Sequence, residues 1–226
     1  MTSSLLHNQR CNISGFSGSV RHLLRSATAT DHAEVDSRFA VLIGRGVAGY
    51  AEFLQLSAAA IAPLEEALRQ ANVERILPDW EDRSRGAALR ADLADLGLST
   101  PPAAPPPSLG GEAHQFGVLY ALEGSRLGAK VLIRRLLKTP GLQAPHPMRY
   151  LRHGESLPLW PTFVEQLKSS AAVRRSTADA IAGAHTAFEW FSADAGPSLS
   201  PRREPRGEGM ELCVSVGTNW QNQARD

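Results

Sequence analysis

Apolar side chains recur every three or four residues over most of the chain between residues 20 and 193. This spacing places them along one face of a helix and predicts helices instead of strands. The first such run covers residues 20–43, and helix-breaking glycines follow it directly. Those glycines are Gly44, Gly46 and Gly49.

Five further helices are expected from the same pattern, at about 50–72, 83–96, 111–138, 161–169 and 176–193. Pro63 is expected to kink the helix over 50–72, because proline removes one backbone hydrogen bond. Gly97 supplies a stop for the helix over 83–96. Gly124 and Gly128 are expected to bend or interrupt the helix over 111–138.

The pattern divides the chain into three parts. Residues 1–18 are polar and are expected to be a disordered lead-in, and residues 19–196 form one all-α domain. Residues 197–226 are rich in Pro, Gly and Arg and predict an irregular tail. Within the domain, 100–108 holds five prolines and predicts an exposed loop.

Composition narrows the class of protein. Of the 226 residues 42% are hydrophobic and 21% charged, and the formal net charge is +1, which offers no basic surface for nucleic acid or an anionic membrane. Cys11 and Cys213 lie far apart and have no metal-binding spacing. With no apolar leader over 1–19, this pattern favours a cytoplasmic protein. The longest apolar run, 53–64, is too short to cross a bilayer.

The pair Gly124 and Gly128 is the first chemical signal. Residues four apart share one helix face, and each glycine costs about 1 kcal/mol relative to Ala in a helix interior. A helix that carries both on one face lets another group approach its backbone closely. That group can be a second helix or a flat ligand.

The second signal is His32. Asp36 follows it by one turn and can accept the second N–H of a metal-bound imidazole. Arg25 precedes it by two turns, roughly 10 Å along a continuous helix. A histidine on iron and a cation on a porphyrin propionate fit this separation.

These pieces occur in the order found in heme oxygenases. The segment 24–32 resembles the family's N-terminal pattern, which ends at the proximal histidine, and 120–129 resembles its distal helix. Segments 50–65, 91–97 and 184–188 are similar to further helices of the family. The resemblance covers roughly residues 19–193 and is strongest to bacterial enzymes that produce biliverdin, including those that supply bacteriophytochromes.

The resemblance implies an all-α, single-domain fold with heme b sandwiched between a proximal and a distal helix. Iron would be bound by His32, with Asp36 as the acceptor behind the imidazole and Arg25 on a propionate. The implied distal, catalytic wall is Gly124, Ser125 and Gly128.

The implied reaction uses O2 and electrons from a ferredoxin or a reductase. A hydroperoxide attacks a meso carbon of heme, and the ring opens to biliverdin with release of CO and iron. A bacteriophytochrome is the implied receiver of biliverdin, and no tightly bound nucleotide, nucleic acid or membrane partner is implied. Mammalian-type members carry a carboxylate at the position of Ser125.

Three other interpretations stay open. The glycines at 44, 46 and 49 match a dinucleotide-binding fingerprint if 39–43 is a strand. The same fold could carry heme without degrading it. The glycines at 124 and 128 could pack helix on helix with no ligand, and Phe188 and Phe191 are expected to be ordinary core.

Overall fold

The computed structural model describes residues 19–139, 142 and 146–193. The predicted lead-in over 1–18, the predicted tail over 197–226, Cys11 and Cys213 lie outside these residues. The described part is helical and contains no strand, which confirms the all-α class. Its elements are α1 (Val20–Ala27), α2 (Ala29–Gly44), α3 (Val47–Gln70), the 3-10 turn η1 (Val73–Arg75), α4 (Trp80–Arg83), α5 (Gly86–Asp95), α6 (Glu112–Leu136), α7 (Arg149–Arg152), α8 (Leu159–Ser169), α9 (Ala171–Arg175) and α10 (Thr177–Ser192).

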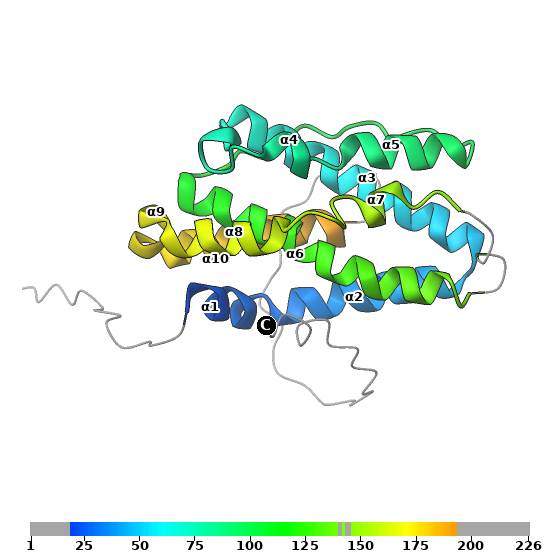
Figure 1. Ribbon diagram of the computed structural model, residues 1–226, viewed down its shortest axis with the longest axis horizontal. Helices are drawn as coiled ribbons and strands as arrows, with labels where there is room; N and C mark the ends of the chain where they lie inside the picture. The colour runs from blue at the N-terminus through cyan, green and yellow to red at the C-terminus, as the bar shows by residue number, and fades with distance from the viewer. Residues whose placement is uncertain (1–18, 140–141, 143–145, 194–226) are drawn as a thin grey trace, which may run out of the picture.

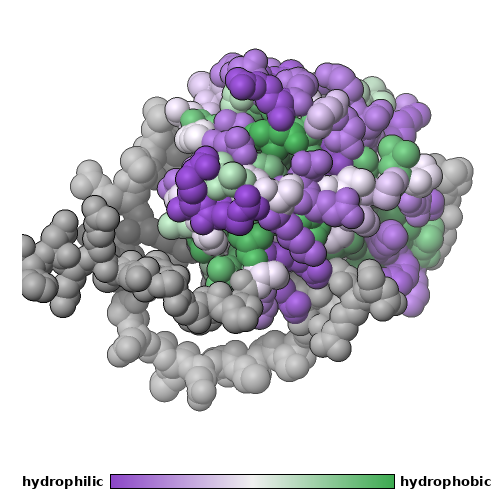
Figure 2. Space-filling model, turned by 60° about the vertical axis from the view of Figure 1, so that its left-hand side comes forward, coloured by the Kyte–Doolittle hydropathy of each residue, from purple (hydrophilic) through white to green (hydrophobic). Residues whose placement is uncertain are grey.

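Figure 1 shows α8 and α10 between α1 and α2 on one side and α4 and α5 on the other, while α6 runs from the level of α8 down to that of α2. The most extensive helix contact is between α6 and α10. Glycines make it close, because a Cβ on Gly117 would overlap the carbonyl oxygen of Ala180, and one on Gly183 would overlap that of His114. Hydrophilic side chains cover most of the face in Figure 2, with smaller apolar patches between them.

The first helix is divided at Thr28, which the apolar pattern did not predict. Thr28 is fully buried, and both its backbone N–H and its hydroxyl donate to the carbonyl oxygen of Leu24, at 3.0 and 2.9 Å. A threonine hydroxyl that bonds back to the preceding turn is a known cause of helix bending. Arg25 and His32 therefore lie on two different helices, α1 and α2. The separation of roughly 10 Å expected for one continuous helix does not apply to them.

The glycine-rich segment after α2 is a helix–helix connection. The α2 helix ends at Gly44, and Gly46 has a φ of 75°, a conformation that favours glycine. Gly49 lies inside α3, where a Cβ would overlap the carbonyl oxygen of Leu42. Residues 39–43 are helical, so the dinucleotide-binding interpretation is wrong.

Two other expectations have different outcomes. The stop after α5 is confirmed: Gly97 has a φ of 68°, and the N–H groups of Gly97 and Leu98 donate to the carbonyls of Ala94 and Leu93, both at 2.9 Å. Of the bend or interruption expected within 111–138, the interruption is wrong, because α6 is one unbroken helix of 25 residues, and the bend stays a prediction.

Helix α3 qualifies by length and composition as a membrane span, contrary to the expectation that every apolar run is too short. Its most apolar window is 61% buried inside the protein, as expected for the central helix of a folded domain. Pro63 lies within α3 and is buried, as are Ile61 and Leu64 beside it, and the kink expected there stays a prediction.

Candidate functional site

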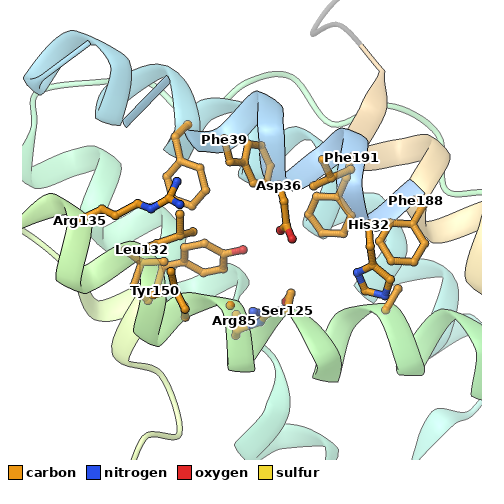
Figure 3. Close-up of a pocket in the computed structure, with 17 residues that line it drawn as sticks. His32, Asp36, Phe39, Arg85, Ser125, Leu132, Arg135, Tyr150, Phe188 and Phe191 are labelled. Carbon is orange, nitrogen blue, oxygen red and sulfur yellow. The ribbon is translucent and has the colours of Figure 1, made fainter. Parts of the chain in front are cut away.

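A cavity separates α2 from α6, and the site is built around it. Here it is called the α2–α6 cavity. His32, Asp36 and Phe39 reach into it from α2, and Ser125 and Leu132 reach it from α6, as Figure 3 shows. The remaining lining residues are Val35, Phe53, Arg85, Ala121, Gly128, Ala129, Val131, Arg135, Tyr150, Leu151, Phe188 and Phe191.

The α2–α6 cavity is narrow and mostly apolar. About 850 Å³ of space lies between its walls when the open mouth is included, but only about 80 Å³ is wide enough for the centre of a water molecule. The cavity is a slot between two facing helices, α2 and α6. Its apolar lining with few polar groups is of the kind that cofactor sites commonly have.

His32 is enclosed by aromatic rings. His32 is only 5% exposed. Its ring centroid lies 4.4 Å from that of Phe188 and 6.4 Å from that of Tyr120, and both contacts are edge-on. Burial, reinforced by the charge of Arg25, lowers the pKa of His32 to about 4. The imidazole is therefore neutral at physiological pH, which is the form that binds iron.

The other two residues predicted around His32 occupy different places. The Asp36 carboxylate points into the α2–α6 cavity from α2 (Figure 3). Arg25 lies on α1 and does not line the cavity, although its charge acts on His32 and on Tyr120. Burial is the main reason why the pKa of Tyr120 is raised to about 12.

Two of the three residues predicted for the distal wall line the cavity. Ser125 and Gly128 line the cavity, and a Cβ added to Gly128 would meet no neighbouring atom of the described residues within 4 Å. The Ser125 hydroxyl donates to the carbonyl oxygen of Leu122 at 2.7 Å. Gly124 is buried in α6 and is not among the lining residues.

Several lining residues were not identified from the sequence. Phe188 and Phe191, expected to be ordinary core, form the α10 wall of the cavity. Tyr150 comes from a segment expected to be irregular, and Arg85 from the link between α4 and α5. Nothing in their local sequence identifies them as site residues, because only the packing of distant helices brings them to the cavity that His32 also lines.

Arg85 is a buried cation at this site. The residue is 4% exposed, donates to the carbonyl oxygen of Leu122 at 2.9 Å, and lies over the ring of Tyr150 at 5.1 Å from the centroid. Among the described residues no carboxylate forms an ion pair with its guanidinium. Buried cations are costly without a counter-charge, so this position favours an anionic group on a ligand.

An ion cluster holds α6 from its other side. Glu123 accepts from Arg83 at 2.8 Å and from Arg126 at 3.1 Å, and all three side chains are buried or nearly so. Arg83 also donates to the carboxylate of Asp79 at 2.7 Å and to the carbonyl of Leu159 at 2.8 Å. The cluster fixes the helix that forms one wall of the α2–α6 cavity.

The described residues form an all-α fold in which a neutral, buried histidine on α2 lies across a mostly apolar cavity from Gly128 of α6. No protein-family model matches the chain. A protein of Xanthomonas campestris pv. campestris (strain 8004) named heme oxygenase is 40% identical over 147 residues, which cover 63% of this chain and 86% of that protein.

A solved structure agrees with this relationship. The NO- and CO-bound heme oxygenase of Neisseria meningitidis matches 81% of this chain and 99% of its own, with a TM-score of 0.62 and 25% identity. The chain belongs to the heme oxygenase family.

Proposed function

We propose that this protein degrades heme oxidatively to biliverdin, CO and iron, with heme b bound in the α2–α6 cavity. The observation that carries the proposal is the neutral, buried imidazole of His32 across a narrow slot from Gly128. Family membership supports degradation of heme over the alternative of a heme carrier. When bound, heme supplies the oxygen chemistry, and the protein supplies ligation and orientation.

The chain's own residues take the following roles. His32 binds the iron through its neutral imidazole, and Asp36 accepts the second imidazole N–H. Arg25 and the buried cation Arg85 bind carboxylates at the edge of the ring. Phe188 and Phe191 exclude water from the cavity, since both wall it from α10.

The distal side is proposed to be α6. The open space beside the Gly128 backbone leaves room for O2 over the ring. The Ser125 side chain reaches the same space, where its hydroxyl oxygen can accept from a water that donates a proton to the ligand. Gly124, one helical turn before Gly128, has no side chain that would widen α6 at that point.

The reaction needs an electron donor and a receiver for its product. The electrons come from a ferredoxin or a reductase in the cytoplasm, and biliverdin passes to a receiver such as a bacteriophytochrome. No tightly bound nucleotide is needed, because the electron donor is a separate protein.

An absorption titration with hemin tests the proposed function. Saturable binding at one equivalent, followed by decay of the Soret band to a bilin absorbance after addition of ascorbate in air, is expected. A Soret band that stays stable under reductant would identify a heme carrier instead. The variant Gly128→Val is expected to bind hemin at least about 100-fold more weakly, because its side chain fills the slot.

A further inference from the structure

A second cavity lies on another side of α6, enclosed by α6, α8 and the segment between α7 and α8. It is called the α6–α8 cavity here. The cavity is partly open to solvent and has a volume of about 600 Å³, which is large enough for a drug-sized or cofactor-sized ligand. The narrow α2–α6 cavity offers about 80 Å³ by the same measure.

The α6–α8 cavity is amphiphilic, and its charge is unbalanced. Its floor contains apolar side chains, among them Trp160, Leu159 and Val164. Five cationic side chains but only two acidic ones line it. The cations are Arg21, Arg85, Arg126, Lys130 and Lys168, and the acids are Glu155 and Glu165.

The protein itself neutralises only part of this charge. Arg126 is engaged with Glu123, and Glu155 lies 3.4 Å from Arg152. Lys130 and Lys168 have no hydrogen-bond or ion-pair partner for their ammonium groups within the described residues. A ligand with more than one carboxylate and an extended apolar body fits such a lining.

The two cavities share a wall. Arg85, Ala129, Tyr150 and Leu151 line both of them. Arg85 has no carboxylate partner among the described residues, so its guanidinium can meet a ligand carboxylate on either side. A molecule formed in the α2–α6 cavity therefore has a cationic residue in common with the larger space beside it.

We propose that the α6–α8 cavity binds biliverdin, the linear dicarboxylate tetrapyrrole formed in the neighbouring cavity. This inference rests on the proposed function. A ring-opened tetrapyrrole is more flexible than heme and can bend to the shape of the larger cavity. Lys130 and Lys168 bind its carboxylates, and Trp160 packs against its conjugated body.

Calorimetric titration of the ferric, heme-loaded protein with biliverdin, without reductant, tests the proposal. The heme blocks the α2–α6 cavity, so saturable binding of one equivalent reports the second cavity. The double variant K130E/K168E is expected to bind biliverdin at least about tenfold more weakly, with hemin affinity unchanged. The matched control is Lys138→Glu, an exposed position near the end of α6 that lines neither cavity.

Three results would overturn the proposal. They are the absence of saturable biliverdin binding to the heme-loaded protein, equal affinity in the wild type and K130E/K168E, and equal binding of a second equivalent of hemin at this cavity. The titration needs no turnover. If hemin is not degraded, the proposed function fails, whereas biliverdin binding that K130E/K168E removes from the heme-free protein still supports the α6–α8 site.

Discussion

The two halves of α6 use glycine for opposite purposes. In the first half, Gly117 lets α10 approach so closely that a Cβ would overlap the carbonyl oxygen of Ala180. In the second half, Gly128 faces the α2–α6 cavity, and a Cβ there would meet no atom within 4 Å. One glycine is required by the fold, and the other leaves room for a ligand.

This difference separates stability from function along one helix. A glycine costs about 1 kcal/mol in a helix interior, so each half must have a reason to keep it. For Gly117 the reason is the contact with α10 that holds Phe188 and Phe191 at the cavity. For Gly128 no side chain or distant backbone of the described residues lies within 4 Å of an added Cβ, and we assign the space beside it to the ligand.

Of the substitutions considered, removal of the buried carboxylate of Glu123 should lower the stability of the protein most. Glu123→Ala leaves Arg83 and Arg126 buried without their shared carboxylate. We expect the free energy of unfolding to fall by about 3–5 kcal/mol in urea denaturation. The control Glu155→Ala removes an exposed carboxylate and should change it by less than about 0.5 kcal/mol. Equal effects would mean that the cluster does not hold the helix.

The burial of His32 at the α2–α6 cavity predicts that the stability of the protein depends on pH. Burial lowers the pKa of His32 to about 4, so between pH 6.5 and pH 4 the unfolded chain binds a proton that the native protein excludes. The heme-free protein should therefore lose up to about 3 kcal/mol of stability as the pH falls through this window. Unfolding of His32→Asn should lack this component. An identical pH profile in both proteins would contradict the burial of His32.

Gly117→Ala should destabilise the fold by about 1–3 kcal/mol, because the added methyl group forces α6 and α10 apart. Thermal unfolding measures this. If the variant is as stable as the wild type, the close approach of the two helices is wrong.

Gly128→Ala should have the smallest effect on the fold and the opposite sign. The methyl group meets no atom, so the helix propensity of alanine should raise stability by up to about 1 kcal/mol. Hemin titration of the same variant should show weaker binding, since the methyl group enters the slot. A stabilised variant with unchanged hemin affinity would show that the ligand does not lie beside Gly128.

Local signals in the sequence predicted much of this molecule. Gly97 stops α5 as expected, because a left-handed glycine after a helix is encoded within a few residues. The helix pattern and the spacing of His32 and Asp36 likewise depend on neighbours in the chain. The break at Thr28 was missed, because a threonine is common inside helices and its bond to Leu24 is seen only in three dimensions.

Contacts between distant segments could not be predicted from the sequence. Arg83 and Glu123 are 40 residues apart, and either one alone resembles an ordinary surface charge. The pairing of Gly117 with α10 and of Gly183 with α6 requires knowing which helices pack together. For the same reason the sequence drew attention to Gly124 and Gly128, but did not identify Arg85 as a lining residue of both cavities.

The most direct test of the central claim is the absorption and electron paramagnetic resonance spectrum of the ferric heme complex of His32→Ala beside wild type. The control is His185→Ala, a half-exposed histidine on α10 that pairs with Asp31 at 2.8 Å. We predict an imidazole-bound iron in the wild type and in His185→Ala, and its loss in His32→Ala. An imidazole-bound spectrum that persists in His32→Ala would contradict the assignment of the α2–α6 cavity as the heme site.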